Sequence, residues 1–271
     1  MNLIVYADFN RPMCCLASQR VDRLLARGLD VQWRAVEHDR RLSMMGTPSA
    51  ALHAAENLDA ARLLLMPGDW LPVTAPDQVS NTRAAVAGYA EAVSDGLQNE
   101  MRRSIFDAIW VHGRHLSDAY EVRRLIADLM WPPVPSMLYR LCDLPTPLAR
   151  ETDLTRAMRR SGGTVIPGGG PLTTIAWRRI RAWREEWRQL PTRELPTLVG
   201  PDGRVSQGIA ALDALAALDT GAPGTLTAAA GLDASAYGAQ QPARQRPGPM
   251  PDAISAALTT SAPMGRRVSR W

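Results

Sequence analysis

The sequence predicts an α/β fold in which a helical domain is inserted between the second and third strands of one sheet. Three observations lead to this prediction. Residues 1–36 have the pattern of a strand, a helix and a second strand, and a block of Ala- and Leu-rich helical segments follows them. The chain then returns to two short strands and a closing helix between residues 194 and 218. Because strand-helix-strand units form parallel pairs with a right-handed crossover, the outer segments can complete one sheet.

The opening unit is defined by short, local signals. Residues 2–7 are apolar and β-prone, which predicts a buried strand. A helical spacing of apolar residues runs from Cys14 to about Arg27, and Gly28 is placed to end that helix. Residues 31–36 alternate between apolar and polar side chains, as in a strand with one buried face.

The middle of the chain changes to helical patterns. Residues 49–65 are rich in Ala and Leu, and Ser80 or Asn81 can cap a following helix that Gly96 ends. Further helices are expected over 98–111, 117–130 and 173–190, whereas 140–172 resembles a long, irregular insertion because of its prolines and glycines.

The last predicted elements complete the sheet. Residues 194–199 and 204–206 form two strands around a Pro-Asp-Gly turn, and 209–218 form the closing helix. After residue 220 the chain has few large apolar side chains, which predicts disorder. The expected organisation is a first part of the α/β domain, the inserted helical domain with its irregular loop, the second part of the α/β domain, and a disordered tail, at 1–45, 46–172, 173–220 and 221–271.

Composition excludes several classes of function. All 31 basic residues are arginine, so Schiff-base chemistry, lysine-anchored pyridoxal phosphate and the P-loop lysine are absent from the chain. The net charge of +4 is too small to indicate nucleic acid, and we predict no nucleic-acid partner. No triplet of spaced Cys, His or carboxylate residues predicts a metal site, since His112 and His115 lack a third ligand. The glycines at 168–170 lack the Lys of a P-loop and indicate a loop.

The expected location is the cytoplasm. The apolar run at residues 3–7 is too short for a signal peptide and has no preceding basic residue. No apolar stretch reaches the roughly 18 residues of a membrane helix, so no membrane partner is predicted. Two of the three cysteines are adjacent, which argues against a disulfide framework and for a reducing compartment.

The turn after the first strand carries the most chemistry. Arg11-Pro12-Met13-Cys14-Cys15 places two thiols in the first turn of a helix, where unpaired N–H groups and the helix dipole favour a thiolate. A Cys-Pro-x-Cys dithiol, however, needs a cysteine at position 11, which is Arg11. Cys14 and Cys15 can therefore be a reactive monothiol pair or two buried small hydrophobes. Arg11 can bind an anion or lie solvated at the surface.

Four segments together resemble the DsbA-like thioredoxin family, in particular its cytoplasmic branch with hydroxychromene-carboxylate isomerases and kappa-class glutathione transferases. Residues 8–16 (DFNRPMCCL) are similar to the family's Asp-Phe-x-Cys-Pro-Trp-Cys-Tyr-Leu opening. Residues 81–85 and 105–118 are similar to helix starts and a Gly turn of its insertion. Residues 195–208 are similar to its cis-proline hairpin. The resemblance implies a thioredoxin-like fold over about residues 2–219, with 131–172 unmatched.

The resemblance also assigns roles to residues. It implies that Leu195 and Pro196 form the cis-proline edge, which binds an extended peptide or a small thiol beside Arg11 and Pro12. Arg11 replaces the attacking cysteine, or the serine that holds glutathione in the isomerase branch, and Cys14 matches the second cysteine. A homodimer is compatible with the family. The resemblance assigns no certain cofactor, and a low-molecular-weight thiol is the candidate.

Three functions follow as alternatives. The first is a thiol oxidoreductase-family protein with a degenerate site and monothiol chemistry at Cys14 as the catalytic residue. The second is a kappa-like transferase or isomerase that holds a small thiol at Arg11, Pro12, Leu195 and Pro196 without a protein nucleophile. The third is a non-catalytic binding or scaffold protein that kept the fold. The tryptophan- and arginine-bearing helix at 173–190 indicates core packing more than a nucleic-acid surface.

Overall fold

A four-stranded sheet forms the centre of the computed structural model, which describes residues 2–130, 164–166, 170–191 and 193–220. Its strands have the spatial order β2-β1-β7-β8, with bounds Asn2–Ala7 for β1, Asp30–Ala35 for β2, Thr197–Val199 for β7 and Val205–Gln207 for β8. β1 runs parallel to β2 and antiparallel to β7, and β8 is antiparallel to β7. The predicted α/β fold class, with helices inserted after the second strand, is confirmed.

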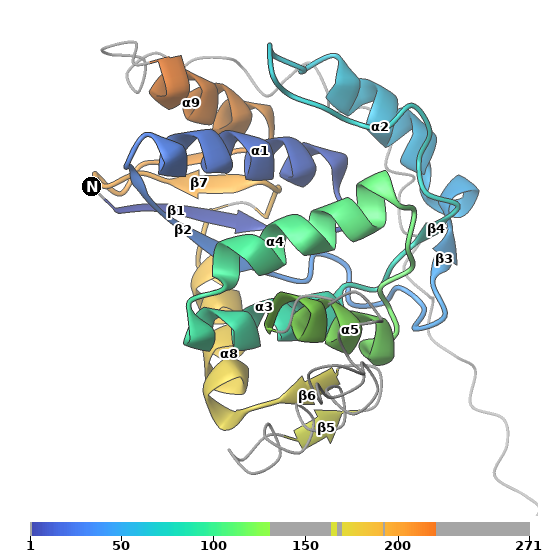
Figure 1. Cartoon of the computed structure of the whole chain (residues 1–271). Helices are drawn as coiled ribbons and strands as arrows, with labels where there is room; N and C mark the ends of the chain where they lie inside the picture. The colour runs from blue at the N-terminus through green and yellow to red at the C-terminus, as the bar shows by residue number, and fades with distance from the viewer. Residues whose placement is uncertain (1, 131–163, 167–169, 192, 221–271) are drawn as a thin grey trace, which may run out of the picture. The chain divides into compact units, whose positions relative to one another are not determined.

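Helices cover both faces of this sheet (Figure 1). On one face α1 (Pro12–Ala26) packs beside α9 (Ile209–Thr220). On the other face lies α8 (Thr174–Arg188), whose Glu186 accepts hydrogen bonds from Tyr6 of β1 and Arg34 of β2. Side chains alternate along a strand, so the neighbouring Trp33 points the opposite way and packs edge-on against Phe106.

The inserted segment is mainly helical. It contains α2 (Ala54–Arg62), α3 (Arg83–Ala92), α4 (Gln98–Phe106) and α5 (Ala119–Met130), with 3-10 helices at Ser49–Leu52 and Val93–Asp95 and a π-helix at Asp107–Val111. Every residue of α3 after Arg83 is buried, because α4, α5 and α8 pack around it. Such close packing needs small side chains: a Cβ at Gly88 would lie 2.5 Å from Val122 Cγ1.

Several local predictions differ from the structure. The helix expected over 98–111 changes to a π-helix at Asp107. Two short hairpins were not predicted: β3 (Thr47–Pro48) with β4 (Gln78–Val79), and β5 (Thr164–Ile166) with β6 (Gly170–Leu172), the latter inside the segment expected to be irregular. The domain boundaries stay a prediction, and both the tail 221–271 and Cys142 lie outside the described residues.

Buried charges tie α1 to two distant segments. The side chain of Asp69, which is 0% exposed, accepts hydrogen bonds from Arg20 Nη2 at 2.7 Å and from Arg23 Nη2 at 2.8 Å. Arg20 also donates to the carbonyls of Leu64 and Leu212, both at 2.8 Å. These bonds join α1 to the chain after α2 and to α9, and they satisfy a guanidinium that is almost completely removed from water.

An aromatic cluster lies where the sheet, α3 and α4 meet. Phe9 is 0% exposed, and its ring centroid is 5.1 Å from that of Phe106 and 6.0 Å from that of Tyr89. Tyr89 donates its hydroxyl to the carbonyl of Trp33 at 2.9 Å. Because Phe9 directly precedes Asn10 and Arg11, this cluster fixes the position of the turn that carries the candidate site.

Candidate functional site

The candidate site begins at the junction of β1 and α1. Pro12 is the first residue of α1, a position that suits proline because its missing N–H has no helical partner there. The carbonyl of Arg11 accepts hydrogen bonds from the N–H groups of Cys14 and Cys15, at 3.0 and 3.1 Å. The side chain of Arg11 makes no capping bond to the helix.

Both cysteines of α1 point into the protein interior. Cys14 is 0% exposed and Cys15 is 4% exposed. Burial raises the pKa of Cys14 far above the ordinary value of a thiol, and burial raises the pKa of Cys15 to about 12. The helix N-terminus favours a thiolate, as predicted, but here the loss of solvation outweighs it. Both thiols of α1 are therefore buried, and burial favours their protonated form.

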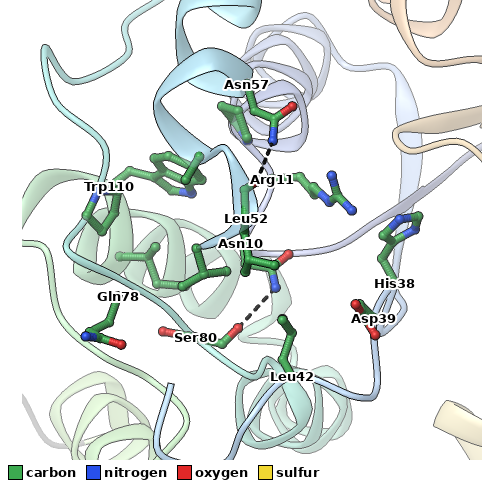
Figure 2. Close-up of a pocket in the computed structure, with 15 residues that line it drawn as sticks. Asn10, Arg11, His38, Asp39, Leu42, Leu52, Asn57, Gln78, Ser80 and Trp110 are labelled. Carbon is green, nitrogen blue, oxygen red and sulfur yellow. Dashed lines mark hydrogen bonds between the residues drawn. The ribbon is translucent and has the colours of Figure 1, made fainter. Parts of the chain in front are cut away.

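A pocket opens in front of Arg11, and Figure 2 shows the residues around it. Its empty space is about 690 Å³, counted with the part open to solvent. Polar and apolar groups share the wall. The polar residues are Asn10, Arg11, His38, Asp39, Asn57, Gln78 and Ser80, and the large apolar ones are Leu42, Leu52, Ile109 and Trp110.

Three polar groups of the wall come from two segments, the turn after β1 and the loop after β2. Asn10 donates to the carbonyl of Ser80 at 3.0 Å, while its buried Oδ1 has no hydrogen-bond partner among the described residues. Figure 2 shows Arg11 extending toward the side of the pocket where His38 lies. Burial and the nearby Arg11 charge lower the pKa of His38, so its imidazole is neutral at pH 7. The wall therefore combines one cation, Arg11, and one anion, the carboxylate of Asp39, with neutral donors and acceptors.

Trp110 closes the wall opposite the helix start. Trp110 belongs to the π-helix, and the Nε1 of its ring donates a hydrogen bond to the carbonyl of Phe9 at 3.0 Å. This bond connects the inserted helices to the turn after β1. The extra residue per turn of a π-helix changes the direction of the side chains that follow it, and such segments are often found at functional sites.

Asp8 lies beneath the pocket and is 0% exposed. Its two carboxyl oxygens accept hydrogen bonds from the N–H groups of Phe9, at 2.8 Å, and His38, at 2.6 Å. Burial raises its pKa to about 6, although these bonds and the charge of Arg11 oppose the rise. Asp8 thus holds the start of α1 and the loop after β2 together, and it carries a proton at mildly acidic pH.

We expect this carboxyl to make the protein less stable as pH rises from 4 to 7. The folded state binds the Asp8 proton more tightly than the unfolded chain, so unfolding releases it between the two pKa values and the free energy of unfolding falls, by roughly 2–3 kcal/mol. Urea unfolding of the wild type and Asp8→Asn across this pH range measures the effect. The variant should lose this component, whereas Asp39→Asn, which removes a carboxyl of lowered pKa, should keep it.

The predicted cis-proline edge lies next to this junction. The Leu195–Pro196 peptide bond is cis, and both residues are buried. The β1–β7 register reaches Tyr6 opposite Thr197, so Pro196 follows beside the end of β1. Among the described residues, Arg11 and Pro12 line the pocket, while Leu195 and Pro196 do not.

Sequence reasoning missed most of the pocket wall. Asp8 and Asn10 belong to the motif at residues 8–16 but received no role, and His38, Asn57 and Trp110 were not considered. A polar side chain at the end of a strand was the available signal: Asp8 directly follows β1, and His38 lies three positions after β2. Asn57 and Trp110 come from the inserted helices, and their approach to α1 depends on tertiary packing.

Two other features, a metal-binding group and a membrane-spanning helix, are absent from the described residues. In that part of the chain no group of three or more His, Cys, Asp or Glu side chains is arranged to hold a metal ion. None of the helices described is both long and apolar enough to cross a membrane.

Comparisons with known proteins agree with this architecture. No family model and no curated protein matches the sequence. Among solved structures, 2-hydroxychromene-2-carboxylate isomerase is similar with a TM-score of 0.52 and 19% identity, over 82% of this chain and 94% of that one. A probable DsbA oxidoreductase from Streptomyces coelicolor is similar with a TM-score of 0.51 and 14% identity, over 82% and 91%. The likeness shows that the chain has the thioredoxin-like fold of DsbA-like proteins.

Proposed function

We propose that this chain, as a member of the DsbA-like thioredoxin family, binds a low-molecular-weight thiol of the glutathione type in the pocket at Arg11. The bound thiol, and no cysteine of the protein, then serves as the nucleophile of an isomerase or transferase. The observation that carries this proposal is the combination of a polar pocket at the start of α1 with two α1 thiols that are buried and protonated.

The groups around the pocket suit such a ligand. A glutathione-like molecule carries carboxylates, for which Arg11 is a bidentate partner, and amide groups, which Asn10 Oδ1 and Asn57 can bind. A sulfur seated at the helix start would have its thiolate stabilised by the helix dipole and by the Arg11 charge. The ligand thiol is accessible to solvent and substrate, so these charges can lower its pKa. Burial instead raises the pKa of Cys14.

The chemistry of an isomerase needs no oxidant. The bound thiolate adds to one carbon of a conjugated double bond in a small organic acid, and the electron pair moves to the conjugated carbonyl. Rotation about the resulting single bond follows, and expulsion of the thiolate restores the double bond in the other geometry. The fold shared with a 2-hydroxychromene-2-carboxylate isomerase supports substrates of this kind.

We expect Arg11→Gln to weaken glutathione binding at least tenfold, about 1.4 kcal/mol, because it removes the cation of the pocket. Isothermal titration calorimetry with glutathione and the folded protein measures this. Arg124→Gln is the matched control, since Arg124 is 64% exposed and neither it nor its partner Glu121 lines the pocket. Cys14→Ala should leave the affinity unchanged.

The opposite pattern would favour the oxidoreductase alternative. In that case glutathione shows no saturable binding, and Cys14 of the folded wild type is alkylated by iodoacetamide within minutes at pH 7. Peptide mass spectrometry of the alkylated protein distinguishes Cys14 from Cys15. If glutathione does not bind and Cys14 is not alkylated, the non-catalytic binding protein is the remaining interpretation.

A further inference from the structure

A second groove, which shares the loop after β2 with the pocket at Arg11, gathers positive charge on α8. Its walls come from α8, from the start of α3 and from the loop after β2, and its empty space is about 1,050 Å³ with the part open to solvent. Five arginines and two glutamates line it together with Trp177, Ile180 and Ala87; the charged residues are Glu37, Arg40, Arg83, Arg181, Arg184, Glu185 and Arg188.

The negative charges of the two glutamates do not neutralise the positive charges of these five arginines. Glu37 is nearly buried and accepts hydrogen bonds from Arg184 at 2.7 Å and from Arg40 at 3.2 Å. Glu185 lies 3.8 Å from Arg188, and both side chains are about half exposed, so the interaction free energy of this ion pair is small. Arg83 and Arg181 have no carboxylate partner in the described part of the chain. A net charge of about +3 therefore faces the groove.

Like charges also crowd each other here. Burial and then the neighbouring Arg40 and Arg188 lower the pKa of Arg184, against the opposing effect of Glu37. An anion bound in the groove would relieve this repulsion. Arginine is suited to the task because its planar guanidinium pairs with phosphate oxygens in a bidentate geometry.

The spacing of the arginines indicates what kind of anion fits. Arg181, Arg184 and Arg188 follow one another along one side of α8 and, at about 1.5 Å per residue, span roughly 10 Å. A single phosphate meets only one end of such a row, whereas linked phosphate groups carry charge along its length. We propose that this groove binds small molecules that bear two or more linked phosphate groups.

Isothermal titration calorimetry of the full chain with tripolyphosphate, inorganic phosphate and ATP tests the proposal. Tripolyphosphate should bind saturably, and inorganic phosphate at least tenfold more weakly. The double variant Arg83→Gln/Arg181→Gln should lose at least tenfold in affinity for tripolyphosphate. The control Arg103→Gln/Arg178→Gln removes the same charge from exposed positions outside the groove and should change it less than twofold.

The titration with ATP distinguishes a nucleotide from a free polyphosphate chain as the ligand. Trp177 is 47% exposed in the groove wall, and Arg181 lies over its ring at 5.6 Å. If ATP binds more tightly than tripolyphosphate and Trp177→Leu removes the difference, the ligand is a nucleotide; equal affinities indicate a free polyphosphate chain.

Three results would overturn the proposal. One is the absence of saturable tripolyphosphate binding, and another is an equal loss in the control double variant, which would indicate a diffuse charge effect. The third is tighter binding of a single-stranded oligonucleotide than of tripolyphosphate, with affinity that rises with its length, because this points to a nucleic-acid strand.

Discussion

Asp69→Ala should lower the free energy of unfolding by about 3–5 kcal/mol, the usual loss when one partner of a buried ion pair is removed. The substitution leaves Arg20, whose side chain is 1% exposed, with a buried positive charge that lacks its carboxylate. It also removes the acceptor for the N–H of Met66 at 3.1 Å and one partner of Arg23. Urea unfolding at pH 7, followed by far-UV circular dichroism, measures the loss.

Asp219→Ala is the matched control for this experiment. Asp219 also pairs with Arg23, at 2.6 Å, but the two side chains are 22% and 29% exposed, so water can replace the lost carboxylate. We expect a change of at most about 1 kcal/mol. If the two variants lose the same free energy of unfolding, the burial of Arg20 is not the reason that the Asp69 contact stabilises the fold.

The pH dependence of the same variant has a defined sign. Burial acts to raise the pKa of Asp69, but the hydrogen bonds from Arg20 and Arg23 outweigh it and lower the pKa below its ordinary value. The carboxylate therefore stabilises the fold above about pH 4, and its contribution is lost as the pH falls further. The difference between wild type and Asp69→Ala should shrink below pH 4.

Phe9→Ala should cost about 3–5 kcal/mol of stability, because it opens a cavity among the rings of Phe106 and Tyr89 in a fully buried site. The same change removes the support behind the turn that carries Asn10 and Arg11. We therefore expect glutathione binding to weaken as well, even though the side chain of Phe9 does not line the pocket. Thermal unfolding and calorimetric titration of one preparation give both results.

Two further variants make this expectation specific. Phe9→Leu keeps most of the buried volume and should lose less than about 1.5 kcal/mol. Tyr120→Ala truncates an aromatic ring that is 61% exposed and should change stability by less than about 0.5 kcal/mol. If Phe9→Ala unfolds no more readily than Phe9→Leu, the aromatic cluster does not position the site as described.

The parts of the fold that were predicted correctly depend on local signals. The strand at Asn2–Ala7 and the helix that starts at Pro12 are marked by an apolar run and by a proline at the first helical position. The hairpin of β7 and β8 follows from a Pro-Asp-Gly turn between β-prone residues. The π-helix was missed, and its Trp110 makes a hydrogen bond to the carbonyl of Phe9, 101 positions away, which no local pattern indicates.

The site was predicted only where it is contiguous in sequence. Arg11 and Pro12 line the pocket as the motif indicated, but Asn57 and Trp110 reach it through the packing of the insertion. The cysteines show the other limit of sequence reasoning. The position of Cys14 in a helix turn is readable from the sequence and favours a thiolate, whereas the desolvation that raises its pKa comes from core packing.

The long insertion has a kinetic consequence for the sheet. β1 pairs with β7, and their contact joins Tyr6 to Thr197, about 190 positions apart. Contacts between such distant residues form late and slow folding, since the intervening chain must be closed into a loop first. During synthesis, β1 leaves the ribosome long before its neighbour exists, with one hydrogen-bonding edge unpaired. The insertion that builds the outer wall of the pocket thus also sets how long the nascent chain is exposed to strand-edge aggregation.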